Sequence, residues 1–295
     1  LRTLVVAALI GIVCWSAAQL GRSGRRFMDD TSLGRLEAWS VAGLLLLSLV
    51  FTSLFAFAPT AFYRLSLEDG PVEWASFALL MGASAVFVSC LFGRRHDDAL
   101  PWYYPASMVA FALLFFVIGM EEVSWLQRLL GFDGLALRGN NQAEVNLHNL
   151  ATNPAENAYY MGALVVLAAV PFVRSLGLLP TNDRYVRTFA ARAAVILVAA
   201  MAWAYNYDMW NVLFTQVAFF GALGILAVLA IYGSQGWLRT LAVLSLVALV
   251  GTQLVLLTSP ENHIRGWAVT EYKELFIPAG FLALSLIHIS EPTRR

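Results

Sequence analysis

Charged residues are scarce in this sequence: they make up 13% of its 295 residues, whereas soluble globular domains average about 25%. Cysteine is nearly absent, and Cys14 and Cys90 lie far apart inside apolar runs, so neither a disulfide framework nor a thiolate metal site is indicated. The net charge is zero, and no basic patch of the kind that binds nucleic acid is present. Hydrophobic residues make up 59% of the chain, and its mean hydropathy is +0.69. This composition predicts a polytopic membrane protein.

A membrane-spanning helix needs about 20 predominantly apolar residues. Eight segments meet that requirement, at residues 3–20, 36–58, 72–93, 104–121, 158–178, 188–206, 209–232 and 237–257, and a ninth begins near Trp267. The sequence therefore predicts an all-α, polytopic membrane helix bundle of about eight to nine transmembrane helices. We expect residues 1–283 to form one transmembrane domain.

The end of the sequence, residues 284–295, resembles the translation of a sequencing-library adapter. We therefore expect this stretch not to be native and the C-terminus to be truncated, and we leave it out of the fold prediction.

Arginine is distributed unequally between alternate connections of the predicted bundle. The connections after the first, third, fifth and seventh spans hold Arg22, Arg25, Arg26, Arg35, Arg94, Arg95, Arg174, Arg184, Arg187 and Arg239. The other connections hold only Arg64, Arg128, Arg138 and Arg265. Because cytoplasmic loops are enriched in Arg and Lys, this pattern predicts a bacterial cytoplasmic (inner) membrane protein whose acidic motifs face the extracytoplasmic side.

Ionisable residues are almost absent from the interiors of the predicted spans. Arg192 lies near the cytoplasmic end of its span, where its side chain can reach the interface. No internal repeat is visible, which argues against an inverted-repeat transporter. The longest polar connection, residues 131–157, is predicted to be an extracytoplasmic loop, and loops of this length are often functional.

The segment Gly119-Met-Glu-Glu-Val-Ser-Trp-Leu-Gln-Arg128 follows the fourth predicted span. If the helix continues through it, one face carries Glu121, Ser124, Trp125 and Arg128, and Glu122 points about 100° away. Acidic residues are unfavourable at the negative C-terminal end of a helix. The pair Glu121 and Glu122 therefore indicates a compensating cation, proton or metal. A structural ion pair between Glu121 and Arg128 is the alternative.

A second segment, Asn140-Asn-Gln-Ala-Glu-Val-Asn-Leu-His-Asn149, would place Glu144 and His148 on the same side of a short helix. A Glu four residues before a His can share a metal with it or orient its ring. The alternative is that His148 is an interfacial hydrogen-bonding residue.

Two further acidic segments begin predicted helices. In Glu68-Asp-Gly-Pro-Val-Glu-Trp74, Pro71 suits the first helical position, and Glu73 is the acid expected to face a shared site. Glu271 and Glu274, spaced by three residues, would share a face near His263.

The motifs at residues 119–128, 146–149 and 68–74 resemble those of uncharacterised bacterial multi-spanning membrane proteins with a Glu-Glu-x-Ser-Trp-x-Gln-Arg and Asn-Leu-His-Asn signature. This resemblance implies no particular reaction. A second similarity, to seven-helix hydrolases of the alkaline ceramidase type, would liken Ser124, His148 and His263 to parts of a zinc site. His96 is predicted to lie on the opposite side, so zinc would need Glu ligands here.

These observations favour a membrane-embedded hydrolase or transferase acting on a lipid or lipid-linked substrate, with membrane lipids as its partners. The expected catalytic residues are Glu121, Glu122 and His148, and the expected substrate-binding residues are Ser124, Arg128, Asn146, Asn149 and Glu73. A divalent metal would be held by Glu122, Glu144, His148, Glu271 and Glu274. Two alternatives stay open: a permease or channel with an acidic outer vestibule, which would take a small-molecule substrate, and a non-catalytic membrane assembly factor.

Overall fold

The computed structural model describes residues 2–23, 33–93, 101–131, 152–180, 183–207, 212–233 and 236–286. Over these ranges the chain is all-helical and contains no strand, which confirms the all-α part of the prediction. The α-helices are α1 (Arg2–Ser23), α2 (Arg35–Phe57), α3 (Pro59–Leu65), α4 (Pro71–Gly93), α5 (Tyr103–Glu122), α6 (Gln127–Leu130), α7 (Thr152–Leu164), α8 (Val170–Ser175), α9 (Arg184–Phe189), α10 (Ala193–Ala199), α11 (Leu213–Tyr232), α12 (Trp237–Thr258) and α13 (Ala268–Leu284). Short helical turns η2 (Ser124–Leu126), η4 (Val165–Ala169), η5 (Ala200–Trp203) and η6 (Pro260–Asn262) join them.

Six helices in the described ranges are long and apolar enough to cross a membrane. They are Arg35–Phe57, Pro71–Gly93, Tyr103–Glu122, Pro154–Ser175, Leu213–Tyr232 and Trp237–Thr258. Each coincides with a predicted span to within a few residues. Two shorter apolar helices, Val6–Ala18 and Ala193–Trp203, fall in two further predicted spans. The structure is therefore compatible with a multi-pass membrane protein.

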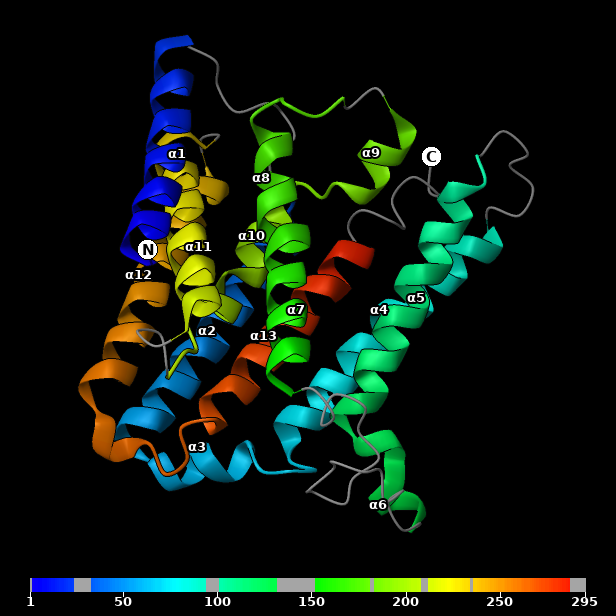
Figure 1. Cartoon of the computed structure of the whole chain (residues 1–295), viewed down its shortest axis with the longest axis vertical. Coiled ribbons are helices and arrows are strands. Elements are labelled where there is room, and N and C mark those ends of the chain that lie inside the picture. The colour runs from blue at the N-terminus through cyan, green and yellow to red at the C-terminus, as the bar shows by residue number, and fades with distance from the viewer. Residues whose placement is uncertain are drawn as a thin grey trace.

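The long helices form two groups, and the short helix α10 lies between them (Figure 1). On one side α4 packs along α5 and α13, and on the other α1 packs on α11, α11 on α12, and α12 on α2. The contact between α4 and α5 is close, because a Cβ atom at Gly119 would lie 2.6 Å from the Met81 side chain and 3.2 Å from that of Leu80. Ser84 Oγ also donates a hydrogen bond to the Ala112 carbonyl, at 2.8 Å. Small residues allow such close packing of membrane helices.

Helix α10 and turn η5 lie between the two groups and touch both α13 and α2. Every residue from 193 to 206 is buried. The prediction of one continuous span at 188–206 is wrong: α9 ends at Phe189, the chain is extended at Ala190 and Arg192, and α10 begins at Ala193. At 1.5 Å per residue, the helix from Ala193 to Trp203 covers only about half of a bilayer core.

Side chains from neighbouring helices bind the chain where η5 ends. Tyr205 Oη lies 3.0 Å from Ser48 Oγ and also donates to the Ser48 carbonyl. Gln253 Nε2 donates to the Asn206 carbonyl at 2.8 Å. Non-helical backbone in an apolar interior needs such partners, since no water satisfies it. These contacts explain how a helix can stop inside the bundle.

A single carboxylate joins the beginnings of α2 and α10. Glu37 is buried; its Oε1 lies 2.5 Å from Arg192, and its Oε2 accepts a hydrogen bond from the Gly34 amide at 2.7 Å. Sequence inspection treated Arg192 as a side chain that reaches the interface, and it overlooked Glu37 as its partner. A buried charge that loses its partner is costly. We infer that Glu37 fixes the position of α10 against α2.

We predict that Glu37→Ala lowers the free energy of unfolding by about 2 kcal/mol or more, because it removes both the cap and the partner of Arg192. Glu37→Gln keeps an acceptor for Gly34 and should cost less. Equilibrium unfolding in mixed micelles measures both. The control is the exposed Arg35→Gln, expected to change stability by at most about 0.5 kcal/mol. Equal effects of Glu37→Ala and Arg35→Gln would contradict the role of the ion pair.

Candidate functional site

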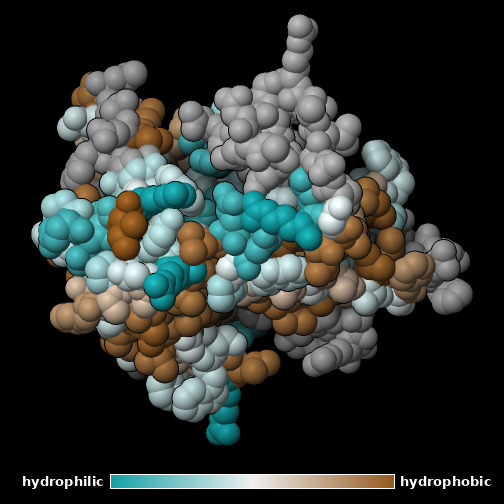
Figure 2. Space-filling model, turned by 90° about the horizontal axis from the view of Figure 1, so that it is seen from below, coloured by the Kyte–Doolittle hydropathy of each residue, from teal (hydrophilic) through white to brown (hydrophobic). Residues whose placement is uncertain are grey.

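The acidic residues that the sequence singled out come from helix ends at one end of the bundle. The C-terminal end of α5 and the N-terminal ends of α4 and α13 all lie at the lower end in Figure 1. Figure 2 shows this end from below, with hydrophilic side chains gathered across it beside hydrophobic ones. The charges of Glu73 and Glu274 act on Glu122 and on Glu271 there, and we call Glu73, Glu122, Glu271 and Glu274 the four-carboxylate group; the charge of Glu156 acts on Glu271 as well.

Like Glu271, Glu122 has no compensating partner in the described part of the chain. It is partly buried at the last position of α5, where the helix dipole is negative. The charges that act on it are those of Glu274 and Glu73, both of the same sign. Among the described residues, no hydrogen-bond donor or cation contacts its carboxylate. Three unfavourable influences therefore coincide on one side chain.

Glu274 is held by α7. Its Oε1 accepts a hydrogen bond from the Tyr160 hydroxyl, and the main-chain oxygen of Glu274 accepts one from Ser76 Oγ of α4 at 3.1 Å. Lys273 is also buried, and its Nζ lies 4.4 Å from the centroid of the Tyr160 ring. A cation over an aromatic face is attracted to it. The site therefore combines carboxylates with a phenol and a buried ammonium group.

Tyr159, the neighbour of Tyr160 on α7, carries the one unsatisfied phenol of the described residues. Its hydroxyl is buried and has no hydrogen-bond partner in the described part of the chain. The charges of Glu122 and Glu274 act on it. A buried hydroxyl without a partner loses free energy relative to one in water. Tyr159 is thus a donor available to a bound molecule or water.

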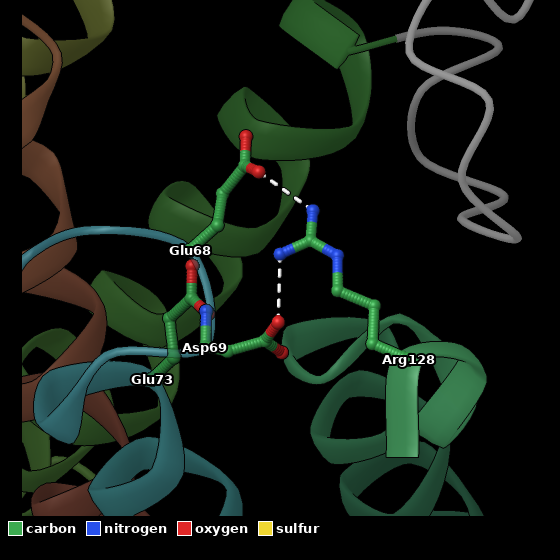
Figure 3. A network of polar contacts seen from close by, with 4 residues as sticks. All are labelled: Glu68, Asp69, Glu73 and Arg128. Carbon is green, nitrogen blue, oxygen red and sulfur yellow. Dashed lines mark hydrogen bonds and ion pairs between the residues drawn. The ribbon is translucent and has the colours of Figure 1, made fainter. Parts of the chain in front are cut away.

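Arg128 bridges two acids of the loop before α4 (Figure 3). Its guanidinium lies 2.6 Å from Glu68 Oε2 and 2.7 Å from Asp69 Oδ2, and the hydrogen bonds to Asp69 and then Glu68 raise its pKa. The Asp69 amide donates to Glu73 Oε2 at 2.5 Å, so Glu73 caps its own helix. The side chains of Arg128 and Glu68 are 42% and 55% exposed, which makes the pair weakly stabilising. Arg128 therefore joins the segment that follows α5 to the loop that precedes α4.

Gly70 makes this loop possible. A Cβ atom at this position would lie 2.4 Å from the carbonyl oxygen of Leu67 and 2.8 Å from that of Leu65. No side chain fits at that separation, so the residue before Pro71 must be glycine. The expectation that Pro71 takes the first helical position is confirmed.

The expectation of a helix continuing through residues 119–128 is wrong. Helix α5 ends at Glu122, and Ser124, Trp125 and Leu126 all have φ values between 47° and 60°. Left-handed backbone costs a residue with a side chain roughly 1 to 2 kcal/mol. Trp125 Nε1 donates to Glu121 Oε1, which ties this turn back to the helix. Glu121 thus supports the turn, Ser124 is buried within it, and Glu122 alone of the two acids joins the four-carboxylate group.

The second motif lies outside the described residues. Glu144, Asn146, His148 and Asn149 fall between 132 and 151. Of the predicted loop 131–157, residues 152–157 are helical and form the start of α7. In the described ranges no three Asp, Glu, His or Cys side chains are placed to hold a metal ion. Metal binding by Glu122, Glu271 and Glu274 with Glu144 and His148 stays a prediction.

We expected His263 to lie near Glu271 and Glu274, but its ring packs elsewhere. Its Nε2 lies 2.9 Å from the Leu256 carbonyl, and its ring packs edge-on against Phe55, with centroids 4.8 Å apart. The loop between α12 and α13 turns the ring toward α2.

Sequence inspection missed Tyr159, Tyr160 and Lys273 as site residues. The two tyrosines fit the pattern of an interfacial aromatic belt. Lys273 is the sole lysine of the chain, and its position between Glu271 and Glu274 is the one signal that might have drawn attention to it.

Comparison with known proteins finds no match: no family model, curated protein or solved structure shows significant similarity to this chain.

We predict that glycine is preferred over alanine at Leu126 by about 1 kcal/mol, because Gly adopts positive φ without strain. At Leu129, in the helical α6, the order should reverse by about the same amount. Both comparisons remove the leucine side chain, so its lost contacts cancel. Unfolding of Leu126→Gly, Leu126→Ala, Leu129→Gly and Leu129→Ala in micelles measures the two differences. The same order at both positions would argue against a left-handed turn.

Proposed function

We propose that this chain is a multi-pass protein of a bacterial cytoplasmic membrane, with about eight to nine spans, and that the four-carboxylate group is an extracytoplasmic acid/base site. The reaction proposed is hydrolysis or group transfer on a lipid or lipid-linked substrate. The uncompensated carboxylate of Glu122 carries the proposal. The excess of Arg in alternate connections supports the orientation.

A carboxylate without a partner of opposite charge lowers the stability of a fold, so a purely structural role does not explain its presence. Glu37 and Arg128, in the same molecule, have partners of opposite charge within 2.7 Å. Glu122 instead faces Glu274 and Glu73. Departures from electrostatic complementarity concentrate at functional sites. A proton, a cation or a polar substrate group would relieve the repulsion.

The surrounding groups suit proton transfer. In this proposal Glu122 exchanges a proton with the substrate, and Glu274, oriented by Tyr160, stabilises the charge that develops. The Tyr159 hydroxyl donates a hydrogen bond to the substrate. Lys273 offsets part of the negative charge through Tyr160. Arg128 acts on the substrate only through the loop that positions Glu73.

Residues 132–151, which lie outside the described part of the chain, add residue types that suit this chemistry. His148 would act as a general base or metal ligand, and Asn146 and Asn149 would hydrogen-bond the substrate. A divalent metal shared by Glu144, His148 and the four-carboxylate group would polarise the bond to be broken.

We predict that producing the wild-type chain in a host membrane changes the abundance of at least one lipid class and that Glu122→Gln abolishes the change. Gln keeps the size of the side chain and removes the carboxylate. Untargeted lipid mass spectrometry of isolated membranes is the measurement. Glu261→Gln, an exposed acid of η6, is the matched control and should behave as wild type. If both proteins reach equal levels in the membrane and the Glu122→Gln protein gives the same lipid profile as wild type, the proposal is contradicted.

We also predict that Glu122→Gln makes the purified protein more stable to thermal unfolding, because it removes one of the repelling charges. Residues that serve a site often cost stability. A structural carboxylate gives the opposite result, as expected for Glu37. A Glu122→Gln protein that unfolds several degrees below wild type would assign Glu122 to the fold instead of to chemistry.

The short central helix favours a second candidate, a permease. Discontinuous helices inside a bundle line the substrate path of many transporters, and α10 with η5 is discontinuous and entirely buried. Uptake of a solute by proteoliposomes, unchanged by Glu122→Gln, would favour the permease over the enzyme. An assembly factor would show neither turnover nor uptake.

A further inference from the structure

A small cavity opens between α3, η6 and the start of α13, at the end of the bundle that also carries the four-carboxylate group. Its walls include Phe55, Phe62, Tyr63, His263, Arg265 and Val269. The cavity volume is about 10 Å³, which is near the minimum that one water molecule needs. None of its lining residues belongs to the four-carboxylate group. The cavity therefore fits one hydroxyl-sized group.

The imidazole of His263 presents an acceptor without a donor. Its Nε2 faces the Leu256 carbonyl, which can only accept, so Nε2 carries the proton. In the neutral ring Nδ1 is then the acceptor. Nδ1 is buried and has no hydrogen-bond partner in the described part of the chain. A buried acceptor without a donor is unfavourable, so this atom calls for a bound O–H or N–H group.

The guanidinium of Arg265 has no carboxylate partner in the described part of the chain. Its guanidinium carbon lies 5.7 Å from the Tyr63 ring centroid and 5.2 Å from the Trp267 centroid, so two aromatic faces hold it. Within the described ranges, no carboxylate lies within ion-pair distance of it. The side chain is exposed. Arginine presented in this way is suited to phosphate.

In the membrane orientation proposed above, the end of the bundle that carries this cavity faces the lipid headgroups. Helix α3 runs across the lower end of the bundle in Figure 1, away from the direction of the long helices. Leu67, Ile264 and Trp267 nearby expose 36%, 48% and 40% of their surface. Amphipathic aromatic side chains concentrate at the boundary between hydrocarbon and water. A molecule bound here would meet both phases.

We propose that this cavity binds the phosphoglycerol headgroup of an anionic phospholipid. The phosphate pairs with Arg265, and one glycerol hydroxyl enters the cavity and donates to His263 Nδ1. The acyl chains lie along the apolar surface. The site is independent of the acid/base site, because binding here requires none of the four-carboxylate group.

The test is lipid binding to the full chain in micelles, followed by native mass spectrometry. Two lipids with identical acyl chains and equal charge are compared: phosphatidylglycerol, and phosphatidylmethanol, which lacks the glycerol hydroxyls. We expect phosphatidylglycerol to bind about five- to tenfold more tightly, the difference that one hydrogen bond makes. Equal binding of the two lipids would overturn the proposal.

Three variants separate the contributions. Arg265→Gln should weaken binding of both anionic lipids, whereas Arg64→Gln, which removes an exposed cation of α3 outside the cavity wall, should leave it unchanged. His263→Gln keeps a donor for Leu256 and lacks Nδ1, so it should bind the two lipids equally. Equal losses in Arg64→Gln and Arg265→Gln would show nonspecific charge attraction and refute the site.

A soluble competitor distinguishes the source of the phosphate. Glycerol 1-phosphate at the same concentration should fail to displace the lipid, because it lacks the acyl chains. Displacement by glycerol 1-phosphate, or by inorganic phosphate, would overturn the assignment to a lipid.

Discussion

The need to satisfy backbone polar groups in an apolar interior governs this structure. Helix α10 and η5 stop inside the bundle, and just beyond their end Gln253 donates to the Asn206 carbonyl while Ser48 holds the Tyr205 side chain. At the other end of α10, the carboxylate of Glu37 binds Arg192. The two groups of long helices are thereby attached to one buried element. Their relative position, and that of the four-carboxylate group, follows from this attachment.

Within the described ranges, five buried side-chain atoms have no hydrogen-bond partner: Tyr159 Oη, Arg192 Nε, Trp203 Nε1, Ser245 Oγ and His263 Nδ1. In the described part of the chain no cation pairs with Glu122, and the Tyr159 hydroxyl has no hydrogen-bond partner. Glu122 lies where α5 ends, at the end of the bundle where α4 and α13 begin, and its charge acts on Tyr159 of α7. Unfavourable electrostatics at such a junction are explained more simply by a ligand than by the fold.

The long apolar helices were accessible from the sequence, because apolar length and composition report on the environment of a helix, whereas the functional role of the acids stays a prediction. The end of α5 was not accessible, since Ser124, Trp125 and Leu126 carry no glycine or proline that would announce a left-handed turn. The break before α10 was hidden for a similar reason: apart from Arg192, the stretch Ala190–Ala204 is apolar, and apolar length alone does not distinguish a span from a buried half-helix. Tyr160 and Lys273 acquire their roles only through packing between α7 and α13, which no local pattern encodes.

The tight contact at Gly119 has a mechanical consequence. Since the side chains of Met81 and Leu80 on α4 leave no room for a Cβ atom at Gly119, and Ser76 Oγ donates to the Glu274 carbonyl, the acids Glu73, Glu122 and Glu274 are carried by three closely packed helices. Helix α7 packs on α11, and it also meets α13 through the hydrogen bond from Tyr160 to Glu274 and through the Tyr159 ring against Phe281. The positions of these three acids relative to one another are therefore fixed by helix packing.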